Sequence, residues 1–141
     1  MYYNKIIPEL DVTSIKKSLE FYHKILGFKI EYQREEDKFA FVSLGTIQFM
    51  LQELDLEYNK WNTGKLEYPF GRGINFQLEV ENVDDIYMNI KKNNYDIMVE
   101  MEENWYRKDN ELLGNKEFLV MDPDGYLLRF SQDLGKKKIK E

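Results

Sequence analysis

The side chains with the most useful chemistry in this sequence are carboxylates, amides and one arginine, on four segments that read as strands. They are Glu9, Gln48, Gln52, Asn75, Gln77, Glu79 and Arg129, with Met50 and Leu127 among them. Such groups bind a ligand through hydrogen bonds and charge. In Ile74–Val80 polar and apolar residues alternate, so the polar set shares one face of a strand. That face either lines a ligand cleft or lies against water on a one-sided sheet.

Residue types that support nucleophilic and metal-dependent catalysis are scarce. The chain has no Cys and one His, His23. A disulfide, a thiolate nucleophile, a Cys-based zinc site and a His-rich metal centre are therefore excluded. His23 falls on a predicted amphipathic helix, where we expect it to be exposed and not to act as a general base.

Arg129 belongs to a hairpin that the sequence predicts over Phe118–Phe130. Two apolar runs flank Asp122-Pro123-Asp124-Gly125, in which Pro restricts one backbone angle and Gly supplies a positive φ, as a tight turn requires. A guanidinium carries donors only and cannot bind a metal ion. We expect Arg129 to pair with Glu79 or Glu9, or to bind an anionic group of a ligand.

Two helices and several strands must position these side chains. The first helix is predicted from an N-cap at Thr13 or Ser14 to about Leu26, and Gly27 then supplies a left-handed C-cap. The second helix is predicted over Asn82–Asn93. The predicted strands are Ile6–Leu10, Phe28–Tyr32, Phe39–Leu44, Ile47–Glu53, Ile74–Val80, Tyr95–Met101 and the two strands of the Phe118–Phe130 hairpin.

The order strand, helix, strand, hairpin occurs twice, with a period of roughly 70 residues. This order predicts an α+β fold of two paired βαβββ modules, at about 5–53 and 74–133, as a two-fold internal repeat. The modules would form a curled mixed sheet with a concave cleft, with the helices on the outer face. We expect one domain over 1–135, followed by a basic, disordered tail over 136–141.

The composition is that of an acidic, aromatic-rich chain of 141 residues with a net charge of −6. Such a charge repels nucleic acid and attracts cations. No apolar run approaches ~20 residues and no signal pattern opens the chain, so we expect a cytoplasmic protein with no membrane or nucleic-acid partner. Both Trp lie in predicted loops, Trp61 in Leu54–Gly73 and Trp105 after Met101. Aromatic side chains there suit a ligand cleft or an interface.

Several motifs together resemble the vicinal oxygen chelate superfamily, which includes glyoxalase I, extradiol dioxygenases, fosfomycin resistance enzymes and bleomycin resistance proteins. The motifs are Ser18-Leu19-Glu20-Phe21-Tyr22 before Leu26-Gly27-Phe28, and Asp122-Pro123-Asp124-Gly125-Tyr126 after Lys116-Glu117-Phe118. The resemblance covers residues 6–133. Phe118-Leu119-Val120 with Leu128-Arg129-Phe130, and Tyr32 before an acidic turn, are most similar to the bleomycin resistance branch.

The resemblance implies that this chain lacks the superfamily's metal site. The four ligand positions of the metal enzymes correspond here to Ile7, Met50, Asn75 and Arg129. Ile and Met offer nothing that a hard or borderline dication prefers, Asn is a weak neutral donor, and Arg cannot bind a cation. An alignment slipped along the strands would place Glu9, Gln48 or Gln52, and Gln77 or Glu79 in the cleft instead. We expect no metal and no other cofactor.

The resemblance implies a homodimer that sequesters a bulky, cationic, aromatic antibiotic without a reaction. The expected ligand-binding residues are Glu31, Tyr32, Phe39, Gln52, Trp61, Asn75, Gln77, Trp105 and Arg129. One departure is that Leu112 and Leu113 precede Gly114 where the branch often has a Trp. Two alternatives stay open: a metal-dependent lyase, dioxygenase or thiol transferase of the same fold, and a small-molecule sensor or accessory module.

Overall fold

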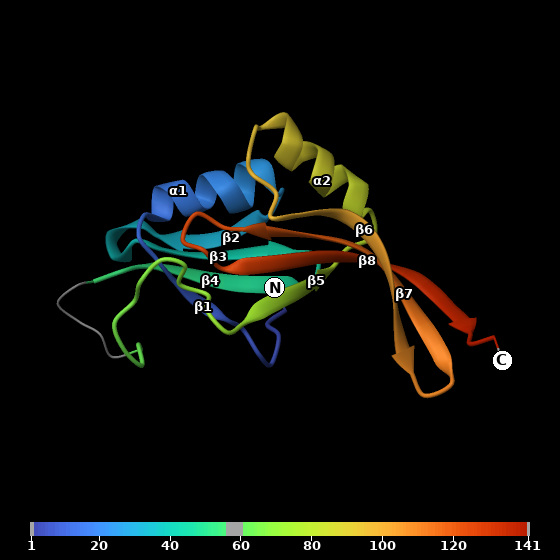
Figure 1. Ribbon diagram of the computed structural model, residues 1–141. Helices are drawn as coiled ribbons and strands as arrows, with labels where there is room; N and C mark the ends of the chain where they lie inside the picture. Colours follow the sequence, from blue (N-terminus) through green and yellow to red (C-terminus); the bar gives the residue numbers. More distant parts are fainter. Residues whose placement is uncertain (1, 56–60, 141) are drawn as a thin grey trace. The chain divides into compact units, whose positions relative to one another are not determined.

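A computed structural model describes residues 2–55 and 61–140 and divides the chain into two compact units. Unit 1 comprises residues 1–70 with the turn 122–125, and unit 2 comprises residues 71–121 and 126–141. Each unit contains one four-stranded mixed sheet and a helix after its first strand, in the order βαβββ (Figure 1), and unit 1 also has a short 3₁₀ helix, Glu35–Asp37, between its second and third strands. The α+β class and the repeated βαβββ order are therefore confirmed. The extent of a single domain over 1–135 stays a prediction.

The sheet of unit 1 has the strand order β1-β4-β3-β2, with β1 parallel to β4 and the other pairs antiparallel. Its strands are β1 Glu9–Val12, β2 Lys29–Arg34, β3 Phe39–Leu44 and β4 Ile47–Glu53. The first strand was expected at Ile6–Leu10, so the prediction is wrong by three residues at the start and by two at the end. Proline has no N–H to give to a ladder, and the carbonyl of Pro8 accepts one bond from the Met50 N–H (2.9 Å) just before regular pairing starts at Glu9.

The helical segment of unit 1 begins as predicted, with Ser14 as N-cap accepting a bond from the Lys17 N–H (3.2 Å). It runs as α1, Ile15–Leu19, and continues as a π-helical turn, Glu20–Ile25. A π turn holds more residues than an α turn, and in this turn the consecutive residues Phe21 and Tyr22 are both buried, with their rings packed edge-on. Gly27 ends the segment with φ +84°.

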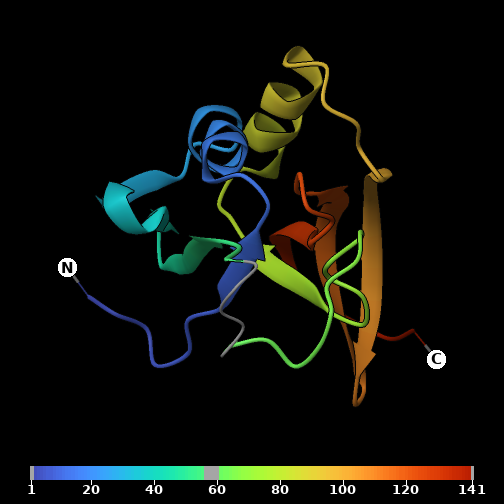
Figure 2. The same cartoon turned by 90° about the vertical axis from the view of Figure 1, so that its left-hand side faces the viewer.

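The sheet of unit 2 has the strand order β5-β8-β7-β6. Its elements are β5 Asn75–Glu79, α2 Val83–Lys92, β6 Val99–Lys108, β7 Glu111–Met121 and β8 Leu127–Lys138. Asn82 caps α2 by accepting a bond from the Asp85 N–H (3.3 Å), and the helix buries Val83, Ile86 and Ile90. Figure 2 shows the connection that follows α2 and leads to β6 at the edge of this sheet.

The strand of unit 2 that was expected to begin at Tyr95 begins at Val99, and two further predictions, which concern the far ends of its long strands, are wrong. The segment with Trp105 was expected to be a loop but belongs to β6, and the basic tail expected from Lys136 continues β8 to Lys138. In Figure 1 these ends form an extended arm, coloured orange to red. Lys136–Lys138 pair with Glu111–Leu113 of β7, and the Lys137 ammonium lies 3.9 Å from the centre of the Trp105 ring. The ladder and this cation–π contact offset the repulsion between neighbouring lysines.

Among the helices of the described residues, none is long and apolar enough to cross a membrane.

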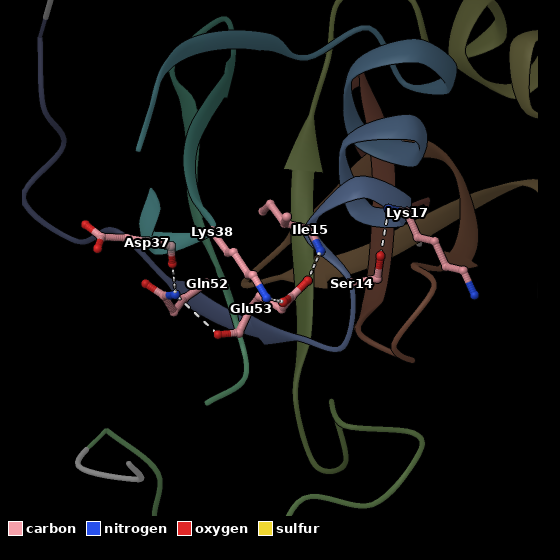
Figure 3. A network of polar contacts seen from close by, with 7 residues as sticks. All are labelled: Ser14, Ile15, Lys17, Asp37, Lys38, Gln52 and Glu53. Carbon is pink, nitrogen blue, oxygen red and sulfur yellow. Dashed lines mark hydrogen bonds and ion pairs between the residues drawn. The ribbon is translucent and has the colours of Figure 1, made fainter. Parts of the chain in front are cut away.

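A polar network in unit 1 joins the end of β4 to the start of α1 (Figure 3). One oxygen of Glu53 accepts a bond from the Ile15 N–H (3.1 Å), and the other pairs with the Lys38 ammonium (3.0 Å). The pKa of Glu53 is lowered, chiefly by the Ile15 N–H and next by Lys38. Ser14 and Glu53 thus both satisfy N–H groups at the start of the helix.

The substitution Glu53→Gln is expected to reduce the free energy of unfolding by about 1 kcal/mol at pH 7. A carboxyl whose pKa is lower in the folded state stabilises the fold at neutral pH, and this contribution is lost as the pH falls through the folded pKa. Urea unfolding should therefore show a difference between wild type and variant that shrinks as the pH falls below the ordinary carboxyl pKa of about 4. Exposed Glu36 supplies the control Glu36→Gln, and an equal loss in that control would contradict the capping role.

Candidate functional site

One face of the unit 1 sheet gathers acidic and aromatic side chains. The register places Glu9 beside Met50 and Asp11 beside Gln52, while Phe41 lies between Met50 and Tyr32. Leu10, Val12, Phe49 and Leu51 alternate with these residues and are buried in the core. We call the set Glu9, Asp11, Tyr32, Phe39 and Phe41, with Trp61 beside it, the acidic–aromatic face.

Glu9 and Asp11 line a pocket of about 280 Å³ together with Trp61. Burial raises the pKa of both carboxyl groups. Asp11 raises the pKa of Glu9 further, whereas a hydrogen bond with Asn62 works against the shift at Asp11. Two carboxylates that are partly removed from water and repel each other are stabilised by any cation that enters between them.

Three aromatic rings continue this face away from the carboxylates. Tyr32 and Phe41 are stacked, with ring centres 5.4 Å apart and planes 13° apart, and Tyr3 meets Phe41 edge-on at 5.5 Å. Tyr32 is 36% exposed, whereas Phe41 is buried. A flat ligand ring can therefore reach Tyr32, which is already held in position by the ring behind it.

An arginine of the chain itself shows that this face accepts cations. The Arg34 guanidinium lies 4.1 Å from the centre of the Phe39 ring, and its Nε donates to Asp37 (3.1 Å). Arg34 also lowers the pKa of Glu9, against the larger effect of burial. A positive charge near this face thus gains from both the aromatic ring and the carboxylate.

Two residues expected to bind ligand are engaged in holding the sheet. Glu31 accepts a bond from the Ser43 hydroxyl (2.8 Å) and pairs with Lys29 at 3.5 Å. Gln52 uses its amide nitrogen to donate to the carbonyls of Asp37 (2.8 Å) and Glu53 (3.2 Å), as Figure 3 shows. Tyr32, Phe39 and Trp61 belong to the acidic–aromatic face, and Gln52 lies beside Asp11 and Phe39 on the same side of the sheet, with its amide nitrogen already bonded to these carbonyls.

The other expected residues belong to unit 2, where Asn75, Gln77 and Arg129 share one face of the sheet. Within unit 2, the partner of Arg129 is Gln77 and not the expected Glu79: Nη2 of Arg129 donates to the side-chain carbonyl of Gln77 (2.6 Å). Gln77 of β5 and Arg129 of β8 are direct partners in the strand register, which brings their side chains together.

Trp105 does not join that set. It lies on the arm opposite Gly114, and a Cβ added at Gly114 would come within 2.6 Å of the Trp105 ring. Lys137 covers the same ring. Trp105 therefore packs against the arm itself, and a side chain at position 114 would have to displace the indole ring from Gly114.

The side chains at the expected metal positions do not fit a metal ion, because Ile7 and Met50 supply no oxygen or nitrogen ligand and Arg129 supplies only donors. Within residues 2–55 and 61–140, no group of three or more His, Cys, Asp or Glu side chains is placed to hold one. The pair Glu9 and Asp11 supplies two carboxylates, which suits an organic cation better than a dedicated metal cage.

Sequence reasoning missed Asp11, Arg34 and Asn62. Asp11 follows Glu9 by two residues and so shares its face in any strand that includes both. The predicted strand ended at Leu10, and this boundary error concealed the carboxylate pair. Arg34 and Asn62 gave no signal, because their positions depend on the fold of a turn and a long loop.

The sequence matches the family model described as the glyoxalase/bleomycin resistance protein/dioxygenase superfamily over residues 8–130. Proteins named bleomycin resistance protein from Geobacillus stearothermophilus and Staphylococcus aureus are each 30% identical to this chain over 136 residues, covering 91% of it and 96% of their own length. Among solved structures, TioX from Micromonospora sp. ML1 aligns with a TM-score of 0.70 at 18% identity, over 93% of this chain and 99% of its own. An integron cassette protein from V. cholerae aligns with a TM-score of 0.69 at 19% identity, over 94% and 97%. At these identities the structural matches show a shared fold alone.

Proposed function

Because the chain belongs to the glyoxalase/bleomycin resistance protein/dioxygenase superfamily, we propose that it binds and sequesters a bulky, cationic, aromatic small molecule without transforming it. The observation that carries this proposal is the acidic–aromatic face of unit 1. There, Glu9 and Asp11 line a pocket with Trp61. The stacked pair Tyr32–Phe41 belongs to the same face.

The physical demands of such a ligand match this face. Its charge is attracted by two carboxylates whose pKa values are raised by burial, since partial removal from water strengthens the interaction between opposite charges. Its rings can stack on Tyr32 and Trp61, which are 36% and 72% exposed. The net charge of −6 adds a long-range attraction.

The curated relatives point to one ligand to try first, because they are named bleomycin resistance proteins. We infer that this chain binds a molecule of that class as a homodimer, as the resemblance of its motifs implies. Sedimentation equilibrium tests the assembly: a mass close to 17 kDa at micromolar concentration would contradict the dimer and leave the binding proposal standing.

Tryptophan fluorescence provides a site-resolved test, because the two Trp residues lie in different units. In the variant Trp105→Phe only Trp61 emits, and copper-loaded bleomycin is expected to quench this emission with one site per chain and micromolar or better affinity. In the variant Trp61→Phe the remaining Trp105 packs against the arm, and we expect its emission to change little.

Two further measurements can contradict this proposal: the dependence of affinity on ionic strength and the metal content of the purified protein. The affinity should fall as salt rises from low to physiological concentration, because screening weakens attraction between charges at a partly exposed site. Absence of quenching in Trp105→Phe would reject bleomycin as the ligand. Stoichiometric nickel, manganese, iron or zinc in protein purified without added metal would overturn the binding-only function and favour the enzyme alternative.

A further inference from the structure

Two buried polar atoms in unit 2 have no hydrogen-bond partner among the described residues: Oε2 of Glu117 and Nε of Arg129. Glu117 is 3% exposed. A buried donor or acceptor without a partner costs free energy, so native proteins retain few of them. Here one is an acceptor and the other is a donor, and no part of the proposed function uses either atom.

The two atoms belong to one face of one sheet. Glu117 pairs with Ser131 and Leu119 pairs with Arg129, so Glu117 and Arg129 are diagonal neighbours on β7 and β8. The Cα atoms of such neighbours are about 7–8 Å apart, so their long side chains can both reach one small group that lies between them. Within the described part of the chain, no ion pair joins the two side chains.

The remaining polar atoms of these side chains are held in place. Oε1 of Glu117 accepts bonds from the Tyr106 hydroxyl and from the Asn104 amide (3.2 Å). The pKa of Tyr106 is raised, chiefly by that bond to Glu117, which keeps the phenol protonated as a donor. Nη2 of Arg129 donates to Gln77 (2.6 Å). Oε2 and Nε are therefore presented by side chains that are already oriented.

The charges select the kind of group that fits. One carboxylate and one guanidinium together carry no net charge, so a free anion gains from Arg129 what it loses to Glu117, and a free cation does the reverse. A neutral group that accepts from Nε and donates to Oε2 satisfies both atoms. A primary carboxamide does this with its carbonyl and its NH₂.

We propose that Glu117 and Arg129 form a subsite of unit 2 that binds a neutral primary carboxamide, positioned by Tyr106, Asn104 and Gln77. This subsite goes beyond the proposed function, since its residues and its ligand chemistry differ from those of the acidic–aromatic face. A carboxamide carried by a larger ligand and a free carboxamide would occupy it through the same two hydrogen bonds.

The test uses benzamide as the probe and ¹H–¹⁵N NMR of the full chain as the readout. Benzamide is expected to shift the amides of β7 and β8 around Leu119 and Arg129, with an affinity in the millimolar range that suits a fragment. N,N-dimethylbenzamide has no N–H to donate and should bind about 10-fold more weakly or less. Arg129→Met should weaken benzamide binding by about the same factor, whereas exposed Arg107→Met is the matched control.

The substitution Glu117→Gln gives an outcome that loss of folding cannot imitate. Tyr106 and Asn104 both donate to Oε1, so the carbonyl of the new amide takes that place and its NH₂ replaces the acceptor Oε2. The subsite then has two donors and an uncompensated guanidinium, and its preference should reverse from benzamide to benzoate by about 10-fold. Three results would each overturn the proposal: wild type that binds benzoate as well as benzamide, an unchanged preference in the variant, or no shift with any probe. None of these results bears on copper-bleomycin quenching of Trp61.

Discussion

The double substitution Glu9→Gln and Asp11→Asn is expected to weaken the binding of a cationic aromatic ligand about 100-fold. Both carboxylates line the pocket beside Trp61, and burial raises the pKa of each. Each substitution removes a charge that a ligand cation would stabilise, at a cost of about 1.4 kcal/mol in affinity. Titration of copper-loaded bleomycin in the Trp105→Phe background measures the change.

The matched control for this effect is Glu35→Gln with Glu36→Gln. These exposed carboxylates lie on the turn after β2, and their removal changes the net charge by the same amount. If the attraction comes from the pocket, the control should lose less than about 3-fold in affinity, through the long-range field alone. An equal loss in both pairs would show that only the overall charge matters.

The pH dependence of binding follows from the same raised pKa values. A cation requires ionised carboxylates, so affinity should fall as the pH drops through pKa values that lie above the ordinary range of about 4. The double variant should bind weakly at every pH.

The same carboxylate has the opposite effect on folding stability. Because the folded pKa of Glu9 is raised, its ionised form lowers the free energy of unfolding at neutral pH. Unliganded Glu9→Gln should therefore be at least as stable as wild type at pH 7.

Removing the internal cation should act in the other direction. Arg34 lies over Phe39 and lowers the pKa of Glu9, so it competes with a ligand for the same favourable environment. Arg34→Met is expected to tighten binding of the cationic ligand by about 3- to 10-fold. A weakened affinity in this variant would instead assign Arg34 a direct role in holding the ligand.

The substitution Gly125→Ala is expected to lower the free energy of unfolding by about 3 kcal/mol or more. Gly125 has φ +86°, and an added Cβ would lie 2.4 Å from Cβ and 2.6 Å from Cα of Pro69. The clash involves backbone as well as side chain, so it cannot be relieved by a change of rotamer. Urea denaturation with a two-state fit measures the loss.

The substitution Gly27→Ala separates the two causes of this loss, which are the positive φ and the clash with Pro69. Gly27 has nearly the same φ, +84°, and nothing lies within 4 Å of an added Cβ. This control should therefore lose only the cost of a left-handed residue, about 1 kcal/mol. Losses of similar size in both variants would show that the contact with Pro69 is unimportant.

The large effect at Gly125 reflects how firmly its turn is held within unit 1. Asp122 accepts bonds from the Tyr22 hydroxyl (2.7 Å) and the Asp124 N–H (3.0 Å). Asp124 in turn accepts from both the N–H (3.2 Å) and the hydroxyl (2.6 Å) of Thr13. Both aspartates are buried, so a displaced turn would leave carboxylates without their donors, at a further cost of folding free energy.

Elements with strong local signals can be predicted from the amino-acid sequence without tertiary information. The N-cap at Thr13 or Ser14, the Gly27 terminus and the Asp122–Gly125 turn all follow from single residue types with one strong conformational preference. The repeated order of elements predicts the α+β class, and alternation places Gln77 and Arg129 on one face. The absence of Cys and the single His limit the available chemistry through composition alone.

Strand boundaries and the meetings of distant polar groups depend instead on the tertiary structure. The sequence of Lys136–Lys138 predicts a disordered tail because their lysines repel, yet a long-range ladder with Glu111–Leu113 orders them. The partnerless atoms of Glu117 and Arg129 and the hydrogen bond between Gln77 and Arg129 likewise depend on contacts between strands that lie far apart in the sequence. Local preference cannot specify such contacts, because each arises from the register of a sheet that only the folded chain creates.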